Sequence, residues 1–96
     1  GNSLVEDINF NPSDLLNIYP NPANDNLQAE YALLDEGKYK IAIFNMEGKM
    51  LILKSINNQL GLISFDTKGL SQGSYILSIT NNSQPSKISK QFNVVH

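Results

Sequence analysis

The sequence predicts an all-β protein, an immunoglobulin-like antiparallel β-sandwich of about seven short strands. Apolar and polar residues alternate with the period of two that half-buried strands show. Turn residues interrupt these segments roughly every 8 to 12 residues, a spacing typical of sandwiches. The 96 residues include 13 asparagines, 10 serines and 10 isoleucines, a composition that weakens helices and favours turns and strands.

The first four predicted strands are runs of alternating apolar residues at 15–19, 27–33, 39–45 and 50–56. Pro20 and Pro22 end the first run, because proline cannot continue a sheet ladder. Glu47-Gly48-Lys49 joins the third run to the fourth as a hairpin turn, in which Gly48 supplies the positive φ that such turns require. This half of the domain is therefore expected to contain one tight hairpin.

The last three predicted strands are at 60–65, 74–80 and 88–95. A corner bounded by glycines is expected at Lys68–Gly73, and a turn that contains Pro85 at Asn81–Ser86. Tyr75, at the entry to strand 74–80, is expected to bury its ring and to bond its hydroxyl back to the corner backbone, as tyrosines near sandwich corners do.

Residues 1–14 are polar and acidic, and we interpret them as a linker that precedes a domain at 15–96. The acids divide unevenly along the chain, because residues 1–36 carry seven acids and no base. Residues 37–96 carry all seven lysines against Glu47 and Asp66. We expect the carboxyl-terminal strand to lie on the more basic side of the domain.

The composition excludes several functional classes. The chain has no cysteine, no arginine and no tryptophan, and its one histidine is His96. Disulfides, thiolate zinc sites, a cysteine nucleophile and an ordinary serine triad are therefore excluded. We expect no enzyme activity, no cofactor and no nucleic-acid partner, since no basic stripe is present. No apolar run approaches the roughly 20 residues of a membrane helix, so no membrane insertion is expected.

Two weaker candidate sites have simpler explanations. Asn24-Asp25-Asn26 offers oxygen ligands, but calcium takes six to eight oxygens, usually with several carboxylates. A turn is the better interpretation, and we predict no metal site. The eight aromatic residues are spread about one per strand, which favours core filling over a sugar-binding face.

Four segments of the sequence occur together in a recognisable order. The first is Ile18-Tyr19-Pro20-Asn21-Pro22 followed by Leu27, and the second is Lys40–Asn45 followed by Gly48-Lys49. The third runs from Ile63–Thr67, including Asp66, through Leu70 to Gly73–Leu77, including Tyr75. The fourth is Ser89-Lys90-Gln91-Phe92.

In this order and spacing, residues 16–96 resemble the type IX secretion system C-terminal sorting domain (type A). The resemblance implies a signal for secretion and cell-surface sorting, recognised by the outer-membrane translocon and removed by a sortase-like peptidase. The parent protein would pass through the periplasm to the cell surface or the medium. Residues 1–14 would then link an upstream cargo protein to the domain and contain the cleavage site.

Within this interpretation the carboxyl-terminal strand is the candidate recognition feature, through Lys87, Lys90, Gln91 and Phe92. The same lysines could instead protect an edge strand against pairing with another chain. The remaining motif residues are expected to set the fold: Tyr19, Pro20, Asn21, Pro22, Gly48, Lys49, Asp66, Leu70, Gly73 and Tyr75. We expect a monomer.

The alternative function is a non-catalytic surface stalk or a carbohydrate-binding immunoglobulin-like module. That alternative predicts an exposed aromatic platform or a defined pocket, because sugars stack on exposed rings. The sorting function predicts neither feature.

Overall fold

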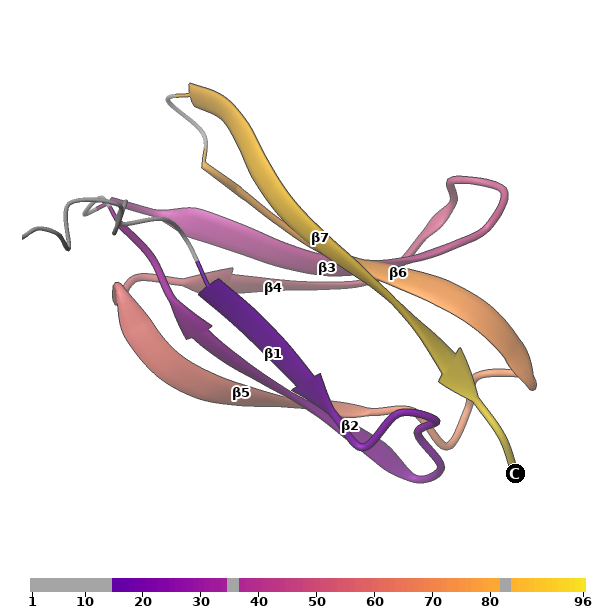
Figure 1. Cartoon of the computed structure of the whole chain (residues 1–96). Coiled ribbons are helices and arrows are strands. Elements are labelled where there is room, and N and C mark those ends of the chain that lie inside the picture. Colours follow the sequence, from indigo (N-terminus) through magenta and orange to yellow (C-terminus); the bar gives the residue numbers. More distant parts are fainter. Residues whose placement is uncertain (1–14, 35–36, 82–83) are drawn as a thin grey trace, which may run out of the picture.

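The computed structural model describes residues 15–34, 37–81 and 84–96, with only the backbone described for 84–87. Seven strands form two sheets, which confirms the predicted all-β sandwich (Figure 1). The three-stranded sheet has the order β1-β2-β5, with β1 at Leu15–Tyr19, β2 at Asn26–Ala32 and β5 at Leu60–Asp66. The four-stranded sheet has the order β4-β3-β6-β7, with β4 at Met50–Ile56, β3 at Tyr39–Asn45, β6 at Gly73–Asn81 and β7 at Gln84–Val94.

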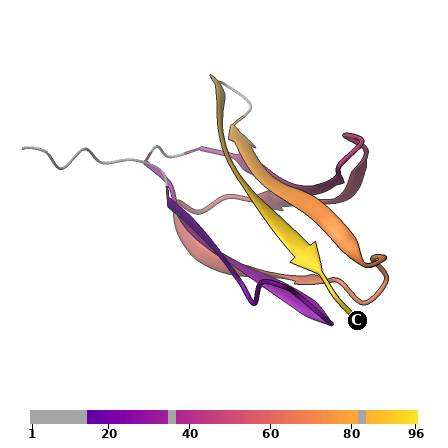
Figure 2. The ribbon, with the colours of Figure 1, turned by 45° about the vertical axis from the view of Figure 1, so that its right-hand side comes forward.

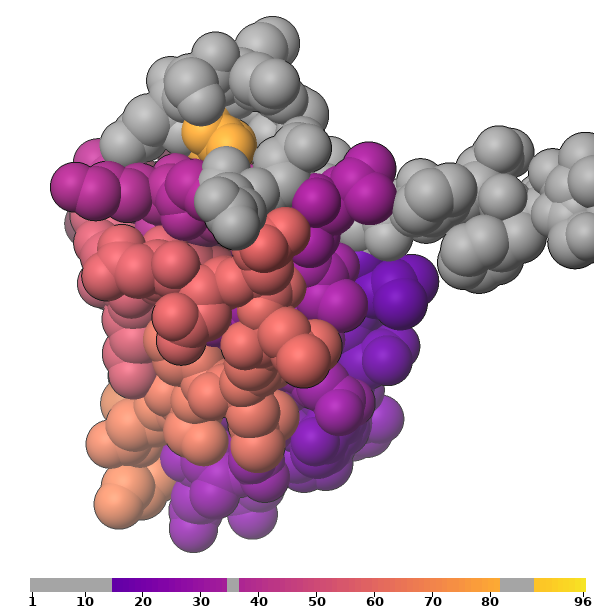
Figure 3. Space-filling view, turned by 90° about the vertical axis from the view of Figure 1, so that its left-hand side faces the viewer, coloured from indigo at the N-terminus to yellow at the C-terminus, as the bar shows by residue number. Residues whose placement is uncertain are grey.

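The chain passes between the two sheets three times, and all paired strands are antiparallel. The segment between β4 and β5 makes one of these crossings, at the end of the molecule that Figure 3 faces. Figure 2, turned by 45°, shows the two sheets as separate layers. The strand orders make β1 and β5 the edge strands of one sheet and β4 and β7 the edge strands of the other.

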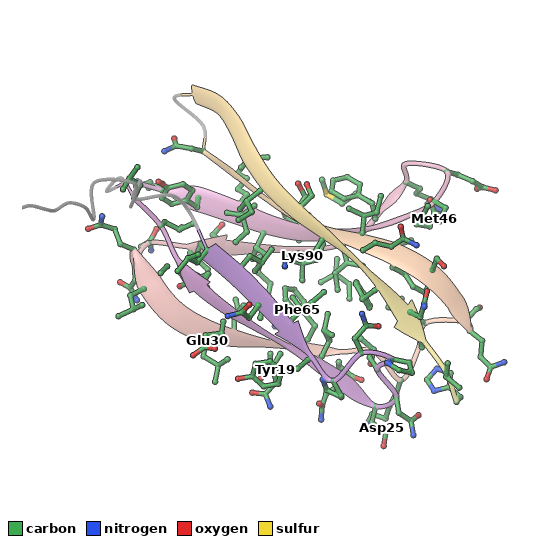
Figure 4. The ribbon with its side chains drawn as sticks, viewed as in Figure 1. Tyr19, Asp25, Glu30, Met46, Phe65 and Lys90 are labelled. Atoms are coloured by element: carbon green, nitrogen blue, oxygen red, sulfur yellow. The ribbon has the colours of Figure 1, made fainter. Side chains whose placement is uncertain are left out.

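The core lies between the sheets and draws on every strand. Phe65 and Phe92 are each 1% exposed, and Figure 4 shows Phe65 between the two layers. The other large core side chains are Leu16, Leu27, Tyr31, Leu33, Tyr39, Ile41, Ile43, Ile56, Tyr75, Leu77, Ile79 and Val94. Gly61 has a packing reason, because a Cβ there would lie 2.7 Å from the hydroxyl oxygen of Tyr31.

One predicted turn is wrong in its extent. Asn81 belongs to β6 and residues 84–86 belong to β7, so the expected turn at Asn81–Ser86 is mostly strand. Pro85 misled the prediction because proline is normally excluded from sheets. β7 is an edge strand, however, and an edge tolerates a residue that cannot donate a ladder hydrogen bond.

Lys54 on the edge strand β4 projects toward the other sheet. It lies on the same face of β4 as Ile52 and Ile56, which face the core. Its Nζ donates to the backbone oxygen of Ser64 on β5 at 2.7 Å and lies 5.0 Å from the ring centre of Phe65. A charge that points inward from an edge strand discourages another chain from pairing there.

Candidate recognition surface

The loop after β1 holds the carboxyl-terminal end of β7. The N–H of Ala23 donates to the oxygen of Asn93, and the N–H of Val95 donates to the oxygen of Ala23, both at 2.8 Å. These bonds make a parallel bridge between Ala23 and Val94, although β1 itself belongs to the other sheet. The loop after the first strand thus closes one side of the sandwich over the last strand.

Asn21 is the residue of the Tyr-Pro-Asn-Pro motif that contacts β7. Its Oδ1 accepts the N–H of Asn93 at 3.0 Å. Pro20 and Pro22 flank it on the surface, each after a cis peptide bond, and Tyr19 is 41% exposed. The motif therefore shapes a surface loop whose central side chain bonds to the last strand.

The contact between the loop after β1 and the end of β7, which we call the clasp, is completed by two residues that the sequence analysis did not assign to it, Thr67 and His96. Thr67 is fully buried, and its hydroxyl donates to the oxygen of Asn24 at 2.9 Å. The ring of His96 contacts Asn24 Oδ1 at 2.9 Å through Nδ1 and the oxygen of Leu70 at 2.7 Å through Nε2. Thr67 follows Asp66 in the third motif, which is the only sequence signal that points to any of these residues.

Asn24 and Asp25 form a bend that leads into β2, which begins at Asn26. Besides the contacts of Asn24, the backbone oxygen of Asp25 accepts the N–H of Thr67 at 3.0 Å. Among the described residues, no group of three or more histidine or carboxylate side chains is placed to hold a metal ion. The described part of the chain also contains no helix of the length and hydropathy that crossing a membrane requires.

The hairpin motif has the predicted turn geometry. Gly48 adopts a φ of 90°, which confirms the expected positive value. Asn45 Oδ1 accepts the N–H groups of Glu47 and Lys49 at 3.0 and 2.9 Å. Lys49 is exposed at this turn. These contacts fix the β3–β4 turn, at the end of the sandwich where Met46 is labelled in Figure 4.

The corner motif also forms as predicted. Asp66 Oδ1 accepts the N–H of Lys68 at 3.0 Å, and Leu70 packs against the core. Gly73 has a φ of 151° where β6 begins. The Tyr75 hydroxyl donates to the oxygen of Ser71 at 2.5 Å, which confirms the expected bond back to the corner.

The four candidate recognition residues on β7 occupy different environments. Phe92 is 1% exposed and stacks on Tyr75 with ring centres 5.7 Å apart, so it packs the core. Gln91 and Lys90 are exposed. Lys90 pairs across from the buried Leu77, and Figure 4 shows it on the side of β7 that faces the other sheet. The side chain of Lys87 lies outside the described part.

Part of the outer edge of β7 is open. Asn93 uses its N–H and oxygen for the loop after β1, so these groups point away from β6. Residues two apart in an antiparallel strand direct their backbone groups the same way. The N–H and C=O groups of Ser89 and Gln91 therefore point to the free edge, where no described strand pairs with them.

The aromatic platform that a carbohydrate-binding module needs is not found on the described surface. Five of the described aromatic residues are buried: Tyr31, Tyr39, Phe65, Tyr75 and Phe92. Phe44 is half-buried on β3, and Tyr19 is exposed at the end of β1. The described residues thus leave no group of rings on one face.

The fold and this surface define an immunoglobulin-like sandwich whose last strand is clasped at one end and open along its edge. The family model of the secretion system C-terminal sorting domain matches residues 17–94. The chain belongs to this family. Searches of the curated proteins and of the solved structures found no match.

Membership of this family establishes the general function of the domain. The domain is a sorting signal for type IX secretion, and it directs a protein to the cell surface or the extracellular medium. It therefore works with the type IX secretion machinery. Its four sequence motifs correspond to the loop, the hairpin, the corner and the terminal strand described above.

Proposed function

We propose that residues 15–96 form a monomeric signal that the outer-membrane translocon recognises in the periplasm and that a sortase-like peptidase then removes. Residues 1–14 link the signal to its cargo and contain the cleaved bond. The family match over residues 17–94 carries this proposal. The domain itself is the sorting signal and has no catalytic role.

The terminal strand is the proposed recognition element. Lys90 and Gln91 are exposed on β7, and the backbone groups of Ser89 and Gln91 face a free edge. An extended segment of a partner can pair with such an edge through backbone hydrogen bonds, while side-chain contacts add specificity. Phe92 supports this element from inside, because its ring anchors β7 to the core.

A fusion experiment tests the proposal. Residues 1–96 are attached to a periplasm-directed fluorescent protein in a host that has a type IX secretion system. We expect fluorescence at the surface or in the medium, and a released cargo whose mass places the cut before Leu15. Fluorescence retained in the periplasm, while a known sorting domain exports the same cargo, would overturn the proposal.

Lysine variants test the terminal strand separately. Replacement of both Lys87 and Lys90 by alanine is expected to reduce export of the fusion. Lys68→Ala is the matched control, because Lys68 is exposed at the corner and outside β7. Equal export by the double variant and the control would remove the lysines from the recognition element and leave edge protection as their role.

A further inference from the structure

The outer face of the four-stranded sheet is apolar at a place where a solvent-facing sheet is usually polar. Ala42, Phe44, Met50 and Leu53 line a hollow of about 140 Å³ there, which we call the outer hollow. Ala42 is 5% exposed although it lies between two core residues on β3 and points away from them. Met50 and Leu53 remain 47% and 48% exposed, so a partner can reach the hollow.

A β-bulge brings the walls of the outer hollow together. The register between β3 and β4 shifts so that Ile43 pairs with Ile52 while Phe44 pairs with Met50. Side chains three residues apart on a regular strand point to opposite faces. The extra residue in β4 reverses this alternation, and Met50 and Leu53 line the same hollow.

The rim of the outer hollow is basic and polar. Lys40, Ser78 and Thr80 form it, and the side chains of Lys40 and Thr80 make no hydrogen bond or ion pair with any described residue. No aspartate or glutamate lies at an outward position on the described parts of this sheet. The outer face of the other sheet has the opposite character, because it carries Glu30 and Asp66 and no lysine.

We propose that the outer hollow binds one apolar side chain of a protein of the secretion machinery, with a neighbouring carboxylate of that protein on Lys40. The inference rests on the proposed function and adds a second contact surface away from β7. The hollow has room for one aliphatic or aromatic side chain. No described residue pairs with the ammonium group of Lys40, and the described residues of this face include no acid, so the group favours a partner segment with negative charge.

Two pairs of matched variants test the proposal in the export fusion. Leu53→Ser is compared with Leu62→Ser, since both leucines point outward from edge strands and are 48% and 56% exposed. Lys40→Glu is compared with Lys68→Glu, since both lysines are exposed. Thermal unfolding of each purified variant is measured to establish that it folds. If Leu53→Ser is unstable, the comparison of Lys40→Glu with Lys68→Glu still tests the proposal.

We expect Leu53→Ser and Lys40→Glu to lower export by about tenfold or more, and their controls to export like the native domain. Export of both hollow variants at the level of their controls would overturn this inference and leave the proposed function intact. Failure of the native fusion itself would instead overturn the proposed function.

Sedimentation of the purified domain distinguishes a second copy of the chain as the occupant. We expect a single species at all concentrations for the native domain and for Leu53→Ser. Self-association that Leu53→Ser abolishes would assign the outer hollow to a contact between copies and would overturn its assignment to the secretion machinery.

Discussion

The edge strands of the two sheets are joined differently on the two sides of the sandwich. On the side of β1 and β7, the chain uses its own backbone, because Ala23 exchanges two hydrogen bonds of 2.8 Å with Asn93 and Val95. On the side of β4 and β5, one side chain reaches across, from Lys54 to Ser64 at 2.7 Å. The side that contains the terminal strand is therefore held by backbone groups, which remain after any side-chain substitution except one to proline.

The comparison shows where the domain fixes its structure and where it leaves it adaptable. Backbone bonds at Ala23 set the position of β7 relative to the loop after β1, whichever side chains surround them. Lys54 lies at an exposed edge, where solvent competes for its contacts. The fixed position of β7 suits the recognition at this strand that we propose, which places no such demand on the opposite edge.

The largest expected effect is loss of the core anchor on the clasped side. Phe92→Ala removes a ring that is 1% exposed and leaves a cavity beside Tyr75. We expect the free energy of unfolding to fall by about 3–5 kcal/mol, measured by urea denaturation. Val95→Ala, at a position 50% exposed, is the control and should change it by less than about 0.5 kcal/mol. Similar losses for both variants would contradict the assignment of Phe92 as an anchor.

An intermediate effect is expected at the hydroxyl that supports the clasp. Thr67→Val keeps the shape of a fully buried side chain and removes its hydrogen bond to the oxygen of Asn24. Since that oxygen loses its donor in a partly buried place, we expect a loss of about 1–2 kcal/mol in the free energy of unfolding. Thr80→Val, on the outer face of β6, should cost less in the same denaturation assay. A larger loss at Thr80 would show that the clasp adds little stability.

The smallest effect is expected on the opposite side. Lys54→Met keeps an apolar stem near Phe65 but loses the charge and the bond to Ser64. We expect a loss below about 1 kcal/mol in thermal unfolding, since exposed contacts of this kind are weak. Lys68→Met is the control for removal of a surface charge. A loss larger than that of Thr67→Val would reverse the comparison between the two sides.

The strands could be predicted because each one produces a local pattern of residues in the sequence. Alternation of apolar residues marks a strand with one buried face, and glycine at position 48 marks a turn that needs a positive φ. Tyr75 was predictable for a similar reason, because its bond to Ser71 spans four residues. Local periodicity and turn chemistry thus account for most of the fold.

The missed features depend on contacts between distant parts of the chain. Ala23 has no side chain that signals its bonds to Asn93 and Val95, which lie some seventy residues later in the sequence. Whether Pro85 ends a strand depends on whether that strand lies at the edge of its sheet. The order of strands in a sheet cannot be predicted from the local pattern of apolar residues. The outer hollow depends on a bulge that joins Met50 and Leu53 on one face, which alternation alone predicts wrongly.

The parallel bridge at Ala23 also bears on how the domain responds to a pulling force. A pull on the chain before β1, opposed by one after β7, would slide Ala23 and β7 past each other. Both backbone bonds and the contact from Asn21 would then be loaded together and would have to break at nearly the same moment. We therefore expect a pull on the two ends of the domain to meet more resistance than a force that separates β4 from β5.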